Sequence, residues 1–191
     1  MSVSNPVVDA IRTRRSIRKM RQDLAPTREQ VAGLIEAATW APNHYMTEPW
    51  RFIVIAGEER SKLGDALASS LAHAFPDTPK EKIEAERLKP LSAPVILTLI
   101  AATKVGPKIV EQEELIAAGA ALQNILLAAH AEGLSTMVRT GAHAYTERMR
   151  RFFELVKGET LVGMVYLGYG VEPHPLGKRT DPKAKTEWRG M

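Results

Sequence analysis

Hydrophobic residues in the segment 25–42 recur with the period of an amphipathic helix. One face of the segment carries Val31, Leu34, Ile35 and Ala38. Positions three and four residues apart share one side of a helix, so this spacing predicts a helix whose apolar side is buried. Thr27 and Gln30 have the spacing of a capping box at its start, and Pro42 marks its end.

Similar patterns predict five more helices. A first helix is expected to have Ser4 as its N-cap and Pro6 in its first turn. Its apolar face carries Val7, Val8 and Ile11. The other helices are predicted at residues 58–72, 79–89, 109–132 and 145–156. The longest of them ends naturally at Gly133.

Continuous apolar runs predict four strands. They lie at residues 51–56, 94–101, 134–140 and 160–169. Strands that are apolar on both sides are covered by helices on both faces, so we expect a mixed α/β or α+β domain. Its length fits one domain over residues 1–191, with a charged, Pro- and Gly-rich tail from about residue 171 to 191.

The helix at 109–132 changes this picture because it is almost entirely apolar between Ile116 and Ala129. A helix that is apolar all round is buried. In a chain of 191 residues, a partner subunit provides the easiest way to bury it. We therefore expect a homodimer.

Composition excludes several kinds of chemistry. The chain has no cysteine, which removes disulfides, thiolate nucleophiles and thiol redox reactions, so any redox function needs a bound cofactor. A net charge of +4 favours an anionic ligand without demanding nucleic acid. The first residues lack the apolar core of a signal peptide, and no apolar run is long enough to span a membrane. We expect a cytoplasmic protein.

Several common site motifs are absent from the chain. The sequence lacks the Gly-rich dinucleotide fingerprint, the Walker loop and the Gly-x-Ser-x-Gly elbow of hydrolases. Its five histidines do not show the spacing of metal ligands, so no metal site is expected.

The stretch RTRRSIRKM, residues 12–20, is the most unusual local feature. It can be read as a solvated charge run, a nucleic-acid arm or a phosphate site. Arginines beside a serine in a loop between two helices suit a terminal phosphate, which needs several donors converging on one dianion. A nucleic-acid arm is more often longer and interleaved with aromatic residues. The phosphate site is the better interpretation.

Two further segments suit a pocket for a flat ligand. WAPNHYMTEPW, residues 40–50, places aromatic and polar side chains in a loop bounded by prolines, where the alternative is a packed hydrophobic corner. MVRTGAH, residues 137–143, ends a strand in a loop, a common place for binding groups.

Three stretches in order, RRSIR, AP…PWRFIVI and AALQNILLAAHAEGLSTMVRTG, resemble the nitroreductase family of FMN-dependent oxidoreductases over roughly residues 5–170. The resemblance implies an α+β fold with a central, mostly antiparallel sheet flanked by helices. It also implies a homodimer with FMN at the subunit interface, NADH or NADPH as co-substrate, and no nucleic-acid or membrane partner.

The resemblance also implies site residues. The expected FMN contacts are Arg14, Arg15, Ser16, Arg18, Trp40, His44, Val138, Arg139 and Thr140, with Lys178 and Arg179 closing the phosphate site. The segment 128–133 is linked with the nicotinamide nucleotide and consists of Ala128, Ala129, His130, Ala131, Glu132 and Gly133. The chain departs from the family pattern at Thr47-Glu48, where Asn-x-Gln is common, and at Met20, which we interpret as packing.

The implied reaction is a ping-pong transfer of hydride from NAD(P)H through flavin N5 to an electron-poor acceptor such as a nitroaromatic or a quinone. No side chain is assigned a proton-transfer role, because the cofactor carries the hydride. Two alternatives remain open at this point. One is a flavoprotein of this fold with another reaction, such as flavin destruction or dehalogenation, and the other is a non-catalytic protein that binds or senses FMN.

Overall fold

The fold is built on a four-stranded sheet, described by a computed structural model for residues 5–171 and 177–191. Its strands are β1 (Trp50–Ala56), β2 (Val95–Ala102), β3 (Ser135–Arg139) and β4 (Glu159–Gly168). Their spatial order is β1-β2-β4-β3, and every neighbouring pair is antiparallel. The antiparallel sheet and the α+β class expected from the family resemblance are confirmed.

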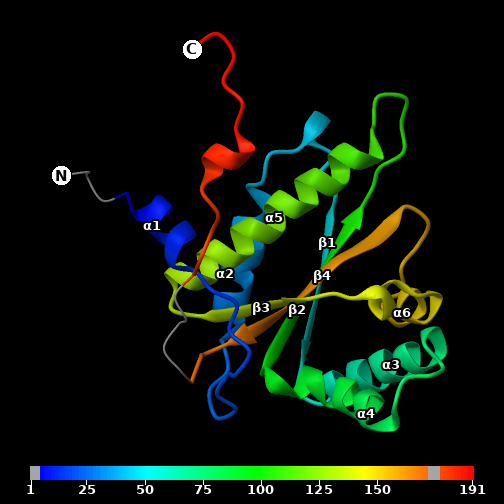
Figure 1. The fold of residues 1–191 in the computed structure, drawn as a ribbon. Coiled ribbons are helices and arrows are strands. Elements are labelled where there is room, and N and C mark those ends of the chain that lie inside the picture. The colour runs from blue at the N-terminus through cyan, green and yellow to red at the C-terminus, as the bar shows by residue number, and fades with distance from the viewer. Residues whose placement is uncertain (1–4, 172–176) are drawn as a thin grey trace.

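Helices cover both faces of this sheet, as the apolar strands predicted (Figure 1). The helices are α1 (Pro6–Thr13), α2 (Arg28–Thr39), α3 (Glu59–Ala74), α4 (Lys80–Leu88), α5 (Glu111–Ala131) and α6 (Glu147–Phe152). Short 3-10 turns are η1 (His44–Met46), η2 (Lys89–Ser92), η3 (Ala142–Tyr145) and η4 (Pro182–Lys185). One face lies against α2 and α5, and the other against α3 and α6, while α4 packs on α3.

Strand alternation divides the core into two clusters. On β2, Leu97 and Leu99 point into the cluster shared with α2 and α5, whereas Ile96 and Ile100 point into the cluster on the other face. All four side chains are fully buried. Because β2 is central and buried on both faces, it reads in the sequence as one continuous apolar run.

Local signals fixed the start of α2 as predicted. The Gln30 amide N–H donates to Thr27 Oγ1 at 3.2 Å, and the Thr27 N–H donates to Gln30 Oε1 at 3.0 Å. At α1 the prediction was wrong, because the side chain of Asn5 caps the helix. Ser4, which was expected to do so, lies outside the described residues.

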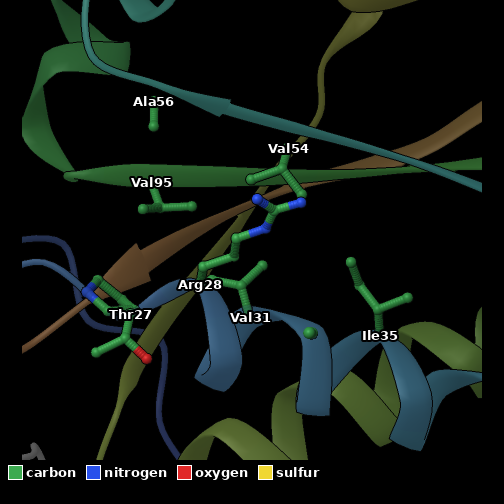
Figure 2. Close-up of a pocket in the computed structure, with 9 residues that line it drawn as sticks. Thr27, Arg28, Val31, Ile35, Val54, Ala56 and Val95 are labelled. Atoms are coloured by element: carbon green, nitrogen blue, oxygen red, sulfur yellow. The ribbon is translucent and has the colours of Figure 1, made fainter.

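Two other elements differ from the predictions. The strand predicted as buried at 51–56 is the edge strand β1, where Val54 is 48% exposed. A groove of about 550 Å³ lies between β1 and α2, and Figure 2 shows Val31 and Ile35 of α2 beside it. The helix predicted at 145–156 is shortened to α6, because Tyr145 belongs to η3, Thr146 is the N-cap, and the turn before β4 starts at Phe153.

The helix α5 is buried on one side and exposed on the other. Ala118, Ala121 and Ile125 are fully buried, whereas Ile116 is 65% exposed. A side chain at Gly119 would meet no neighbour within 4 Å. Among the described residues α5 alone has the length and hydropathy of a membrane span, but it packs on α2 and the sheet. Its apolar sequence therefore reflects a core face plus an uncovered apolar face.

A bidentate ion pair ties β1 to the start of β4 across the sheet. Arg51 donates through Nε and Nη2 to the two carboxylate oxygens of Glu159, both at 2.7 Å. These hydrogen bonds hold the pKa of Glu159 below its ordinary value of 4.5, against the opposing effect of burial. Glu159 Oε2 also accepts a hydrogen bond from the Val156 N–H at 3.1 Å. The ion pair therefore organises the turn before β4.

Replacing Glu159 by Gln is expected to lower the free energy of unfolding by about 2 kcal/mol at neutral pH, because a charge-assisted bidentate contact is lost. A lowered folded-state pKa means that the stabilisation is complete above the ordinary carboxyl pKa and disappears as the pH falls through the folded value. Urea unfolding at neutral pH and at about pH 3 should therefore show that the difference in free energy of unfolding between parent and variant becomes smaller in acid. Glu59→Gln, which removes an exposed pair with Lys62, is the control; an equal effect there would contradict the argument.

Candidate functional site

The basic loop after α1 is fixed against the outer edge of β3. The Ile17 N–H donates to the Thr136 carbonyl at 2.9 Å, and Ser16 forms a parallel bridge with the same residue. Ile17 and Met20 are each 6% exposed, so they anchor the loop to the core while Ser16 and Arg18 stay on the surface. The packing role predicted for Met20 is confirmed.

Four arginines line one cavity beside this loop. Its volume is about 490 Å³, and it is lined by Ile11, Arg12, Arg14, Arg15, Gln123, Gly177 and Arg179. None of these described lining residues is acidic. Burial lowers the pKa of Arg14, and the neighbouring charges of Arg15 and Arg179 lower it further. Positive charge gathered from four arginines favours an anion in the cavity.

The tail closes this cavity at Gly177. A Cβ at that position would collide with the Arg15 guanidinium, so the chain passes close to the arginine. Arg15 Nη1 also donates to the carbonyl oxygens of Arg12 and Arg14, at 2.5 and 2.7 Å, which braces the loop. Arg179 lines the cavity with the arginines of the loop, whereas Lys178 is exposed beside it and does not line the cavity.

His44 lies at the other end of α5, whereas Trp40 is the residue that ends α2. His44 Nδ1 is 2.6 Å from Glu113 Oε2 in the first turn of α5, and Trp40 is 77% exposed. The arginine end of the helix is marked by a contact of 2.8 Å between Thr13 Oγ1 and His130 Nε2. The helical rise separates Glu113 from His130 by about 25 Å. Gln123, which lines the arginine cavity, lies about 15 Å from Glu113 along the helix, so one protomer keeps His44 apart from this cavity.

The end of β3 presents its side chains to opposite faces. Val138 packs on the α2 and α5 side of the sheet, whereas the Arg139 guanidinium lies 5.0 Å from the ring centroid of Tyr166 on the other side. Tyr166 is 1% exposed, and burial raises the pKa of its hydroxyl. The guanidinium of Arg139 thus points away from the arginine cavity. The alternation of β3 could have predicted this, because Arg139 has the parity of Met137.

The remaining expected residues are Thr140 and the segment 128–133. Thr140 is exposed just after β3, and the segment 128–133 forms the last turn of α5 and its Gly133 stop, where φ is +75°. Sequence reasoning missed Gln123 and Gly177 as lining residues. Gln123 is a polar residue on an apolar helix, which is the one signal that could have marked it. The described residues contain no cluster of three or more His, Cys, Asp or Glu side chains that could hold a metal ion.

Backbone strain is concentrated in the loop that carries His44. Tyr45, Met46 and Glu48 have φ angles of +52°, +51° and +47°, in the left-handed region that favours glycine. We expect Met46→Gly to raise the free energy of unfolding by about 1 kcal/mol by removing that strain, since the Met46 side chain is 83% exposed. Chemical denaturation measures the change.

Val105→Gly provides the matched control for this prediction. Val105 is 99% exposed and is not among the described residues with a positive φ, so glycine there should leave stability unchanged or lower it. A stabilisation by Val105→Gly, or none by Met46→Gly, would show that the left-handed backbone does not carry the strain.

Comparisons with known proteins agree with this architecture. A protein-family model described as "Nitroreductase family" matches residues 11–169. The protein YdjA of Escherichia coli (strain K12) is 32% identical over 155 residues, which are 81% of this chain and 83% of that protein. A nitroreductase-like family protein from Bacillus cereus, solved by crystallography, superposes with a TM-score of 0.82 at 30% identity, covering 100% of both chains.

A further solved structure has a similar fold. The FMN and NADPH-dependent nitroreductase NfnB from sphigopyxis sp. strain HMH has a TM-score of 0.76 at 19% identity, covering 99% of this chain and 100% of that chain. The family match spans most of the sequence, and YdjA is similar over more than two thirds of both chains. The chain belongs to the nitroreductase family.

Proposed function

We propose that the protein is a cytoplasmic, FMN-dependent oxidoreductase that uses NAD(P)H to reduce an electron-poor acceptor. The observation that carries this proposal is the cavity lined by Arg12, Arg14, Arg15 and Arg179. Its donors suit a phosphate dianion, and its volume of about 490 Å³ is within the usual range for small-molecule sites. Family membership and the description of NfnB as an FMN and NADPH-dependent nitroreductase support a flavin phosphate there.

In this proposal the basic loop holds the phosphate. Arg14, Arg15 and Arg179 bind its oxygens, while Ser16 and Arg18 lie on the exposed side of the same loop, toward the rest of the cofactor. Val138 and Thr140 flank the ring from the end of β3. Arg139 contributes through its backbone, because its guanidinium lies against Tyr166. The last turn of α5, residues 128–133, is placed to contact the nicotinamide nucleotide.

A homodimer resolves the separation of the site residues along α5. The exposed side of this helix carries Leu115, Ile116 and Gly119, an apolar surface that water would otherwise cover. Two α5 helices packed antiparallel across it would bring the His44 end of one protomer to the arginine end of its partner. Each FMN would then contact both subunits.

The protein's own contribution is positioning and charge. FMN, when bound, supplies a carrier that takes a hydride from NAD(P)H and delivers two electrons to the second substrate. A nitro group that takes up two electrons and two protons gives a nitroso group and water, and the protons come from solvent. Arg18 is available to favour negative charge on the cofactor, because it is exposed beside the cavity.

Steady-state oxidation of NADH and NADPH by the FMN-loaded protein tests this function. With 4-nitrobenzamide or a quinone as acceptor, the proposal predicts turnover with parallel double-reciprocal lines, the pattern of a ping-pong mechanism. Flavin binding without turnover would favour a storage or sensing protein. Loss of the flavin spectrum, or release of halide from a halogenated aromatic, would instead favour the alternative reactions.

A further inference from the structure

The helix α1 is held to its own protomer by little apolar packing. None of its residues is buried, and Val7 and Ile11, which belong to its apolar face, are 61% and 53% exposed. The end of α1 nevertheless forms one wall of the arginine cavity, through Ile11 and Arg12. The shape of the cavity therefore depends on the contacts that fix the end of this helix.

A hydrogen bond joins the end of α1 to the last turn of α5. Thr13, the last residue of α1, has its Oγ1 2.8 Å from His130 Nε2, and Figure 1 shows the two helices meeting there. A hydroxyl carries one proton, and Thr13 Oγ1 donates this proton to the Asp9 carbonyl at 2.7 Å. His130 Nε2 must therefore carry a proton of its own and donate it to Thr13.

Arg14 and Arg15 lie between two fixed points of the chain. Before them, Thr13 is held to His130 of α5. After them, the Ile17 N–H donates to a carbonyl of β3 at 2.9 Å. Because both ends are held, the two arginines line one cavity. If one end were released, they would gain conformational freedom that a bound phosphate must remove again.

His130 itself lies outside the cavity. The residue of α5 that lines the cavity is Gln123, about two helical turns before His130. Thr13 is not a lining residue either, although its neighbours Arg12 and Arg14 are. The hydrogen bond between Thr13 and His130 therefore fixes the cavity wall without contacting what the cavity holds.

We propose that His130 is a positioning residue of the phosphate site, which holds the end of α1 so that Arg14 and Arg15 are preorganised for the phosphate of FMN. The inference rests on the proposed function. His130 acts through Thr13 rather than on the cofactor. This role differs from the contact with the nicotinamide nucleotide that the family resemblance implies for the segment 128–133.

Two ligands that differ only in the phosphate separate this role from a general loss of structure. His130→Leu is expected to weaken the Kd for FMN about fivefold in a fluorescence titration, because the arginines are no longer preorganised. The Kd for riboflavin, which lacks the phosphate, should stay within about twofold of the parental value. An unchanged Kd for FMN, or equal losses for FMN and riboflavin, would overturn the inference.

Variants on both sides of the hydrogen bond provide the controls. Thr13→Val keeps the shape of the side chain without its hydroxyl and should weaken FMN binding as much as His130→Leu does. The double variant should bind no more weakly than either single variant, because both remove the same contact. His130→Gln retains an N–H donor and should bind FMN like the parent. His73→Leu, an exposed change on α3, should have no effect, and a loss there equal to that of His130→Leu would contradict the proposed role.

Steady-state kinetics at saturating FMN distinguishes this role from a contact with the nicotinamide nucleotide. A residue that positions only the phosphate loop leaves the KM for NADH unchanged once every subunit carries flavin. We therefore expect the parental KM for NADH in His130→Leu. A parental Kd for FMN together with a raised KM for NADH would place His130 at the nicotinamide nucleotide and overturn the inference.

Hydrogen exchange of the flavin-free protein gives a readout that does not depend on the proposed function. The Arg14 N–H donates to the Ala10 carbonyl at 2.9 Å at the end of α1, and His130→Leu is expected to speed its exchange about fivefold. Unchanged exchange in this variant would overturn the inference alone. Failure of the parental protein to bind FMN would remove the proposed function itself. The two failures are therefore distinguishable.

Discussion

Replacing Arg14 and Arg15 together by alanine is expected to weaken FMN binding by roughly 10²- to 10⁴-fold. Each arginine that donates to a phosphate contributes about 1.5–3 kcal/mol, and Arg14 and Arg15, which both line the cavity beside α5, would each make such a contact. Burial and two neighbouring cations also lower the pKa of Arg14. Its charged form is therefore destabilised in the cavity, and a bound anion would stabilise it. Fluorescence titration with FMN measures the change in Kd.

The control for this prediction removes two positive charges at a distance from the cavity, on α6. Arg148 and Arg151 are exposed on α6, so Arg148→Ala/Arg151→Ala should leave the FMN Kd within about twofold of the parent. Arg14→Lys/Arg15→Lys should restore part of the affinity, because lysine keeps the charge but not the planar fork. Retention of parental FMN affinity by the double alanine variant would contradict the phosphate assignment.

Replacing Gly119 by arginine is expected to convert the protein into a monomer that loses its flavin. In the isolated protomer this change is harmless, because a side chain at Gly119 meets nothing within 4 Å and arginine is a better helix former than glycine. In an antiparallel pair of α5 helices the same side chain enters the contact, with its charge buried against Ile116 of each subunit. Light scattering after size exclusion reports the mass, and absorbance reports the flavin.

A matched glycine on another helix separates association from folding. Gly33 is exposed on α2, and a Cβ there makes an ordinary contact at 3.8 Å with Glu132. Gly33→Arg should therefore leave both mass and flavin content unchanged. A Gly119→Arg protein that stays dimeric and retains its flavin would show that α5 does not form the interface. The proposed contact of each FMN with both subunits across α5 would then be wrong.

The sequence predicted those elements whose local signals and tertiary packing agree. The capping box at Thr27 and Gln30 and the apolar run of β2 correspond to the structure closely, because each is determined by neighbours along the chain or by burial on both faces. β1 has a similar apolar run but lies at the edge of the sheet. Strand order depends on contacts far apart in sequence, so composition does not distinguish an edge strand from a central one.

The sequence named part of the arginine cavity, and the role of these residues stays a prediction. A loop rich in arginine and serine pointed to a phosphate, and the arginine cavity agrees with that interpretation. The inclusion of Gln123 and Gly177 depends on where α5 and the tail lie, which no local pattern encodes. The strained backbone at Tyr45 was also beyond prediction, because its left-handed conformation is imposed by Glu113 and Glu114 of a helix that begins far along the chain.

The central claim, that the arginine cavity holds a flavin phosphate, is tested most directly by a visible absorption spectrum. The purified protein is incubated with excess FMN, desalted and scanned, with the Arg14→Ala/Arg15→Ala variant treated in parallel. We predict a retained flavin band at about one FMN per subunit in the parent and none in the variant. A parent that remains colourless after reconstitution, or a variant that retains as much flavin as the parent, would contradict the account.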